Sequence, residues 1–206
     1  LSTGSGGGTA GCYVSNSVYN GNYASAGGGA CRADYVNGPV VDCTFVSNSA
    51  SHGGGVIEIN AERCVFYRNS ATYGGGAFYS CLSACLLYDN SAVVGGGVGD
   101  YSTLISCTVT KNTATSEGGV GYLCNSVGSI IVGNIAPNYP NYETGYGWTY
   151  TCSQPLPSGL GCFTNDPCFV DSNGNDFHLA SNSPCIDAGT TNEQTMDLDG
   201  IPRPLD

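Results

Sequence analysis

Apolar and polar residues alternate along short segments of this chain, and the same pattern returns every 21 or 22 residues between positions 41 and 132. In one copy, Cys43 and Phe45 fall on one face of an extended segment, while Thr44 and Val46 fall on the other. A side-chain period of two is typical of β-strands. No segment shows the i, i+3, i+4, i+7 spacing of an amphipathic helix. The pattern therefore predicts an all-β protein made of short strands.

Each copy of the repeat places a cysteine, an apolar residue, an asparagine and an alanine at fixed distances from one another. The copies begin at Cys43, Cys64, Cys85 and Cys107, and related copies with serine in the first position begin at Ser17 and Ser129. Glycine-rich turns follow most copies, at 27–29, 53–55, 74–76, 95–97 and 118–119. A unit this short buries its apolar side only by stacking on its neighbours.

The length of the unit selects one kind of solenoid. Helical repeats need units of roughly 30 residues or more, and the skeleton of leucine-rich repeats is missing. Period-two alternation and glycine triplets favour a right-handed parallel β-helix of about six coils over 1–139. Residues 140–206 lose the repeat, and we expect them to form a capping tail in the same structural domain.

Stacking at the usual strand spacing of about 4.8 Å places equivalent residues directly above one another. One such column contains only asparagines, at a turn: Asn22, Asn48, Asn69, Asn90, Asn112 and Asn134. A buried asparagine donates to one neighbouring coil and accepts from the other, which satisfies polar groups that a bend leaves unpaired. We expect this column to have a structural role.

Twelve cysteines and no CxxC motif or zinc-type spacing favour an oxidising, extracytoplasmic location. Cys43, Cys64, Cys85 and Cys107 share an inward column, where neighbours are close enough for disulfides, although reduced and packed thiols are favoured. We predict disulfides in the tail and across the first two coils: Cys168–Cys185, Cys152–Cys162 and Cys12–Cys31. The spacing alone leaves the connectivity open.

The formal net charge is −11, and residues 140–206 hold nine acidic residues against one basic residue, Arg203. Five basic residues in the whole chain cannot neutralise many phosphates, so nucleic acid is not an expected partner. No apolar run approaches the ~18 residues of a transmembrane helix. The chain begins with leucine and shows no signal peptide, as a mature or trimmed chain would.

Two sets of sequence segments resemble those of known bacterial protein families. The Phe45-x-x-Asn48 and Phe66-x-x-Asn69 steps, each followed by glycines and a small apolar residue, resemble the repeats of polymorphic outer-membrane proteins. The tail segments 166–171, 183–189 and 197–204 resemble the ending of secreted β-helix proteins of the choice-of-anchor Q type. Together the resemblance covers about residues 6–136 and 150–204. It implies a right-handed β-helix that is secreted or on the bacterial cell surface, and it supplies no catalytic residues.

An outward stripe of residues is too apolar to stay exposed over five coils: Thr44, Val46, Val65, Tyr67, Leu86, Tyr88, Thr108, Thr110, Ile130 and Val132. One interpretation is that the tail covers it with Phe169, Phe177 and Ile186. The other is an adhesin-like platform on which Tyr67 and Tyr88 stack against a glycan or a protein of the host or cell surface. A structural spacer fits the composition equally well.

An enzyme is the alternative function. We expect Glu58 and Asp100 to share a column two coils apart, about 9.6 Å between backbones. Carboxylates near this separation suit an inverting glycosidase, and β-helices host polysaccharide hydrolases and lyases. The motifs of polygalacturonases are absent, so we predict a non-enzymatic protein.

Asp171, Asn173 and Asn175 match the start of a calcium loop. The glycine at position six is missing, and position twelve is Asn182 instead of glutamate. We therefore expect an Asn/Gly-rich turn without a cofactor, with calcium as the alternative. The sequence leaves the oligomeric state open.

Overall fold

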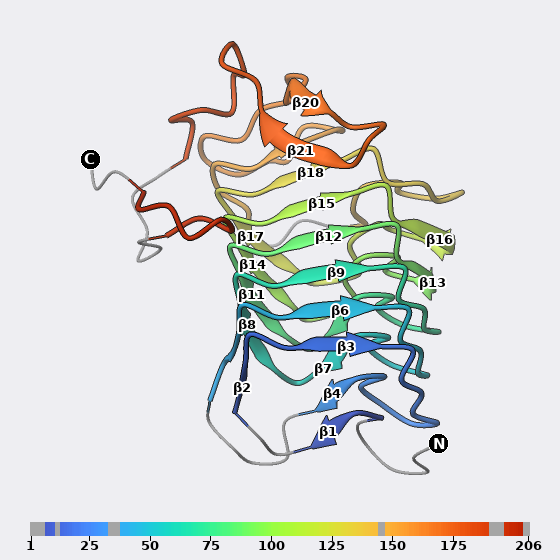
Figure 1. Cartoon of the computed structure of the whole chain (residues 1–206). Coiled ribbons are helices and arrows are strands. Elements are labelled where there is room, and N and C mark those ends of the chain that lie inside the picture. Colours follow the sequence, from blue (N-terminus) through green and yellow to red (C-terminus); the bar gives the residue numbers. More distant parts are fainter. Residues whose placement is uncertain (1–6, 11–12, 33–37, 144–146, 190–195, 204–206) are drawn as a thin grey trace.

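The structure is a computed structural model that describes residues 7–10, 13–32, 38–143, 147–189 and 196–203. Over these residues it contains strands and turns but no helix. The strands stack in parallel into a solenoid of about six coils, as Figure 1 shows. The sequence prediction of an all-β parallel β-helix is confirmed.

Three parallel sheets run along the solenoid, and the later coils continue the third sheet only by single bridges at Val98, Val120 and Tyr142. The largest contains β3 (Val18–Asn20), β6 (Thr44–Val46), β9 (Val65–Tyr67), β12 (Leu86–Tyr88), β15 (Thr108–Thr110), β18 (Ile130–Val132) and β19 (Cys152–Ser153). The second contains β2 (Val14–Ser15), β5 (Val40–Val41), β8 (Asn60–Glu62), β11 (Cys81–Ser83), β14 (Thr103–Ile105) and β17 (Asn125–Val127). The third contains β1 (Thr9–Ala10), β4 (Cys31–Arg32), β7 (Val56–Ile57) and β10 (Ala77–Phe78).

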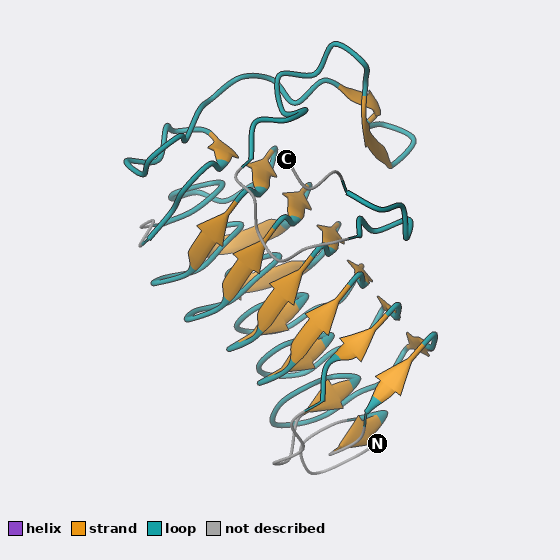
Figure 2. Cartoon of the chain, turned by 90° about the vertical axis from the view of Figure 1, so that its left-hand side faces the viewer, coloured by secondary structure: helices purple, strands orange, loops and turns teal. Residues whose placement is uncertain are grey.

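Two smaller sheets complete the fold. One is the parallel pair β13 (Ser91–Val94) and β16 (Thr113–Glu117), and the other is the antiparallel pair β20 (Phe169–Asp171) and β21 (Asp176–Leu179) in the tail. Figure 2 shows the coils in succession and the tail at one end of the stack.

The inward residues of the largest sheet form one column of the core. Phe45, Phe66, Leu87, Val109 and Ile131 are fully buried, and each pairs in register with its neighbour on the next coil. The Phe45 and Phe66 rings stack with centroids 4.8 Å apart. Burial of each such side chain contributes about 1.5–3 kcal/mol. Inward residues of the other two sheets, such as Leu82, Leu104 and Val56, are also fully buried and complete this core.

The asparagine column forms a continuous hydrogen-bonded ladder. The backbone amide and the Nδ2 of Asn48 both donate to Oδ1 of Asn69, each at 3.0 Å. The Nδ2 of Asn48 also donates to the Tyr19 carbonyl of the preceding coil at 2.9 Å. The same amide-to-amide step joins all six predicted residues: Asn22, Asn48, Asn69, Asn90, Asn112 and Asn134. Each side chain therefore ties its own coil to a neighbour.

The first glycine of a triplet adopts a backbone conformation that a side chain would not fit. Gly53 has a φ of 60°, and a Cβ there would lie 2.0 Å from the Val56 carbonyl oxygen. Glycine reaches this region without a steric cost. The triplets thus let the chain turn sharply just before it enters the third sheet, as Gly53 does before β7.

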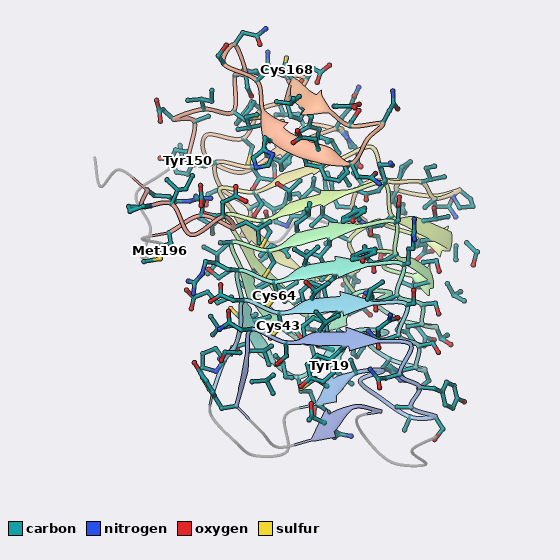
Figure 3. The ribbon with its side chains drawn as sticks, in the orientation of Figure 1. Tyr19, Cys43, Cys64, Tyr150, Cys168 and Met196 are labelled. Carbon is teal, nitrogen blue, oxygen red and sulfur yellow. The ribbon has the colours of Figure 1, made fainter. Side chains whose placement is uncertain are left out.

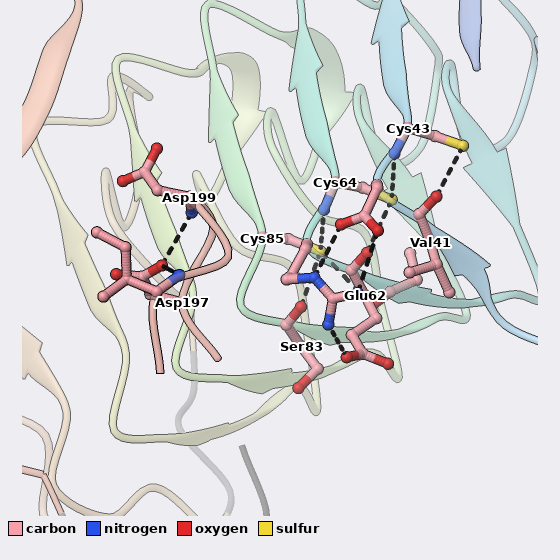
Figure 4. A network of polar contacts seen from close by, with 12 residues as sticks. Val41, Cys43, Glu62, Cys64, Ser83, Cys85, Asp197 and Asp199 are labelled. Atoms are coloured by element: carbon pink, nitrogen blue, oxygen red, sulfur yellow. Dashed lines mark hydrogen bonds and ion pairs between the residues drawn. The ribbon is translucent and has the colours of Figure 1, made fainter. Parts of the chain in front are cut away.

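The cysteine column lies inside the solenoid (Figure 3). The Cys43 amide donates to Cys64 Sγ, and the Cys64 amide donates to Cys85 Sγ, each at 3.4 Å. Figure 4 shows these thiols on successive coils. Burial raises the pKa of the Cys85 thiol. The four thiols, including Cys107, are free and pack as small apolar groups with weak polar contacts.

The solenoid extends further than the repeat predicts. Residues 140–206 lose the repeat in sequence, yet Thr149 pairs with Val127, and β19 pairs with β18. Trp148 is buried, and its Nε1 donates to the Cys124 carbonyl at 2.7 Å. The final coil therefore continues to Ser153 although its sequence no longer matches the repeat.

Candidate functional site: a cleft between the coils and the tail

The tail packs against the outward stripe at Tyr88. Phe177 of β21 is buried and lies against Tyr88, with ring centroids 5.3 Å apart. Phe169 meets Phe177 edge-on at 5.5 Å. Ile186, in contrast, is 44% exposed. The predicted covering of the stripe is thus partial.

A cleft of about 790 Å³ lies beside this contact, between the stacked coils and the tail. Its floor comes from outward residues of three successive coils, Leu86, Thr108 and Ile130. The opposite wall comes from β21, from the segment 185–189, and from the turn around Asp197. The cleft exists because the tail leaves the end of the solenoid and returns along its side (Figure 1).

His178 joins two separate parts of the tail wall. Its Nδ1 lies 2.5 Å from Asp176 Oδ1, and its Nε2 lies 2.9 Å from Asp199 Oδ2. The hydrogen bond to Asp176 raises the pKa of His178 most, and the hydrogen bond to Asp199 raises it further. The same contact lowers the pKa of Asp176. A protonated His178 therefore fastens β21 to the turn that carries Asp199.

The turn at Asp197 is held by its own side chain. Asp197 Oδ1 accepts hydrogen bonds from the Asp199 amide at 3.0 Å and the Ile201 amide at 2.8 Å. Figure 4 shows the contact between Asp197 and Asp199. Self-capping by an aspartate in this way stabilises a tight turn. Asp199 is thereby presented to His178 in a fixed position.

Carboxylates dominate the charge of the cleft. Its lining includes Asp176, Asp187, Asp197 and Asp199. The cationic groups in the lining are His178 and Arg203. With a net charge of −11 on the whole chain, the cleft disfavours anionic ligands and favours neutral or cationic ones.

The two tyrosines predicted to bind ligand have their ring faces occupied. Tyr67 and Tyr88 stack on each other at 5.2 Å with an interplanar angle of 9°. The Arg68 guanidinium lies over Tyr67 at 5.9 Å, and Phe177 covers Tyr88. Burial raises the pKa of Tyr88. Neither ring lines the cleft, so the stacking role of this pair stays a prediction.

Glu58 and Asp100 do not share the column that the sequence predicts. The Glu58 amide donates to the Phe78 carbonyl, one residue before Tyr79. The Tyr79 amide donates to the Asp100 carbonyl, one residue before Tyr101. Tyr101, not Asp100, is therefore the equivalent of Tyr79, and the two rings stack at 5.1 Å. The extra residue in this coil shifts Asp100 by one position.

Both acids have structural partners. Glu58 Oε2 lies 3.3 Å from Arg32 Nη2. Asp100 Oδ1 accepts a hydrogen bond from the Tyr122 amide at 2.8 Å. Neither residue lines the cleft. The geometry thus offers no support for the glycosidase pair.

The loop predicted as a weak calcium site binds the side chain of Lys111, which belongs to one of the coils. Lys111 Nζ donates to the Ser172 carbonyl at 3.4 Å and to Asn175 Oδ1 at 2.5 Å. Asp171 Oδ1 accepts from the Gly174 amide at 3.0 Å, as in an Asn/Gly-rich turn. Across the described ranges, no three His, Cys, Asp or Glu side chains cluster as metal ligands do. Asn173 lies in the same exposed turn.

The predicted disulfides are not confirmed. The eleven cysteines within the described residues are free thiols, and Cys12 lies outside the described residues. Cys162 is half-buried and packs against the core, whereas Cys152 lines the cleft. Cys31 is buried, and Cys168 is half-buried in the tail.

Sequence reasoning missed the residues that form the cleft wall, above all His178, Asp187 and Asp199. One signal was present, because Asp176 and His178 are two apart and share one face of a strand. The second partner of His178, Asp199, lies 21 residues further along the chain, and no repeat in the sequence indicates that contact.

Comparison with known proteins finds one local match. Residues 63–81 match the family described as the Chlamydia polymorphic membrane protein repeat. This range begins just after β8 and runs through β9 and β10 to the first residue of β11, about one coil. No curated protein and no solved structure matches the chain. Within the described part of the chain, no helix is long and apolar enough to span a membrane.

Proposed function

We propose that this protein is a secreted or surface-displayed bacterial β-helix module that binds a glycan in the cleft without cleaving it. The match of one coil to a polymorphic membrane protein repeat supports a location on or outside the bacterial cell. The cleft carries the proposal of binding, because it sets an apolar floor against a wall of hydrogen-bond acceptors.

This composition suits a sugar. Ligand sites are mostly apolar, with a few polar groups that fix the ligand's orientation. The pyranose ring has apolar C–H faces that fit a floor of Leu86 and Ile130, and its hydroxyls donate to carboxylates such as Asp187. Carboxylates repel uronates and sulfated sugars, so the ligand class is a neutral or amino-sugar oligosaccharide.

The size of the cleft favours an oligosaccharide over a folded protein partner. Ligand sites of about 300–1,000 Å³ hold small molecules, and this cleft has about 790 Å³. A stable protein interface instead buries about 800 Å² on each partner. The cleft is concave and local, as a glycan site is.

Calorimetric titration with three oligosaccharides of equal length tests the proposal. We expect N-acetylated chitin oligomers to bind, chitosan oligomers to bind more tightly at low salt, and oligogalacturonate not to bind. Mass spectrometry of the same samples should show intact sugars. Products would establish an enzyme, preference for oligogalacturonate would overturn the ligand class, and no binding of any sugar would favour a spacer.

A further inference from the structure

Cys152 stands in the outward column, yet it is buried. Cys152 pairs in register with Ile130, whose side chain points out of the solenoid into the cleft. Its exposure is only 1%, because the tail covers it. Its thiol lies close to the Asn165 carbonyl, at 3.1 Å. Cys152 is thus the point at which the last coil meets the tail.

Cys185 of the tail meets Cys152 at this point. The two thiols lie close enough to perturb each other, because their contact raises the pKa of Cys152 and lowers the pKa of Cys185. Both line the cleft. The Cys185 amide donates to Ser183 Oγ at 3.1 Å, and Ser183 Oγ donates to the Pro167 carbonyl at 2.5 Å. These bonds hold the short segment that presents Cys185 to the coil.

The other cysteines of the tail point elsewhere. Phe163 pairs with Cys152 across the last coil and lines the cleft with it. Side chains alternate along an extended chain, so Cys162 faces away from Cys152 and toward the core. The Cys168 thiol donates to the Asp166 carbonyl at 3.5 Å. The geometry therefore separates Cys152 from Cys162.

We propose that Cys152 and Cys185 form a disulfide that fastens the tail to the last coil and fixes the cleft wall. Neighbouring thiols that both line one cleft are candidates for such a bond, which forms at an S–S distance of about 2.05 Å when the two Cβ atoms face each other. The bond would close a loop of 33 residues, which restricts the unfolded chain. It would also keep His178 and Asp187 in place beside the coils.

The chemistry is a thiol–disulfide exchange with a small-molecule disulfide such as oxidised glutathione. The contact with Cys152 lowers the pKa of Cys185, which makes Cys185 the attacking thiolate. Its attack forms a mixed disulfide and releases one glutathione thiolate. Cys152 then gives up its proton and attacks the Cys185 sulfur, which releases the second glutathione. Two protein thiols are oxidised, one glutathione disulfide is reduced, and both protons go to the glutathiones.

Peptide mapping of the wild-type protein tests the pairing directly. The protein is incubated with oxidised and reduced glutathione, alkylated, and digested with chymotrypsin without reduction. Trypsin is unsuitable because no lysine or arginine lies between the two cysteines. We expect a cross-linked peptide that contains Cys152 and Cys185. Cross-links between Cys152 and Cys162 or between Cys168 and Cys185, or alkylation of both proposed cysteines, would overturn the proposal.

Limited proteolysis then tests the effect on the tail. We expect oxidised wild-type protein to lose its tail several-fold more slowly than reduced protein. C185S should lose its tail at the reduced rate with or without reductant, while the control C168S should behave like the wild type. Sensitivity to reductant that persists in C185S would contradict the proposal. Neither experiment uses a sugar, so its result is independent of glycan binding.

Discussion

Asn134 donates from its backbone amide and its Nδ2 to Oδ1 of Asn141, at 3.0 and 3.1 Å, although only seven residues separate the two. Tyr142 pairs with Val120, which places Asn141 at the coil position of Gly119. A Cβ at Gly119 would lie 2.4 Å from the Asn134 Cβ, so the glycine is required there. In the last coil no repeat asparagine fills that space, and the side chain of Asn141 occupies it.

Asn141 thus ends the ladder from a different position on the coil. Its Nδ2 donates to the Gln154 carbonyl at 2.8 Å, which satisfies the terminal amide. The ladder is closed at this end by a residue that the repeat does not contain.

Removal of an internal ladder residue should lower stability strongly. Asn69→Ala leaves the Asn48 amide and the Phe45 carbonyl without their partners. Each unsatisfied buried group costs about 1–3 kcal/mol, so we expect the free energy of unfolding to fall by at least about 2 kcal/mol in urea titrations. Asn173→Ala, in an exposed turn, is the control and should change it by less than about 0.5 kcal/mol. Equal effects of the two substitutions would contradict the ladder's role.

Asn141→Ala should loosen the last coil before the rest. The single tryptophan, Trp148, is buried in that coil and reports its opening. We expect its emission to shift to the red at a lower urea concentration in the variant than in the wild type. Circular dichroism should show the remaining coils unfolding at a higher urea concentration than the tryptophan transition. A tryptophan transition unchanged from the wild type would show that Asn141 does not hold the coil.

The contact between His178 and its two aspartates should make tail docking depend on pH. The pKa of His178 is raised, so its contribution is complete below its unfolded value of about 6.5 and is lost as pH rises through the folded value. The pKa of Asp176 is lowered, so its contribution is present above about pH 4 and is lost as pH falls. Docking should therefore be strongest between about pH 4 and 6.5.

NMR titration of the two histidines measures this directly. We expect the imidazole signal that disappears in H178N to titrate above the ordinary value for histidine, and tail proteolysis to be faster at pH 8 than at pH 5. A His178 that titrates at or below the ordinary value would contradict the contact.

Calcium should not stabilise the protein. Lys111 Nζ occupies the acceptor of Asn175 that a cation would need. We expect the melting temperature to be the same in millimolar calcium as in EDTA. A rise with calcium that Asp171→Asn abolishes would restore the calcium loop as a site.

The repeat made most of the fold predictable, because equivalent residues on adjacent coils stack directly on one another. Phe45 meets Phe66, and Asn69 meets Asn90, so a fixed spacing in sequence gives the contact in space. The candidate site was not predictable in this way. One extra residue moved Asp100 out of line with Glu58, and the contact of His178 with Asp199 depends on how an irregular tail returns along the coils.

Glycan binding by the wild type, Asp187→Asn and Glu58→Gln tests the central claim most directly. Asp187 has a φ of 53°, a conformation that asparagine also tolerates, so its substitution removes a charge without straining the turn. In calorimetric titrations with chitosan oligomers, we expect Asp187→Asn to weaken binding about tenfold, as loss of a hydrogen bond to a charged group does. Glu58→Gln, outside the cleft, should bind like the wild type. Equal affinities for Asp187→Asn and the wild type, or a selective loss in Glu58→Gln, would contradict a glycan site between the coils and the tail.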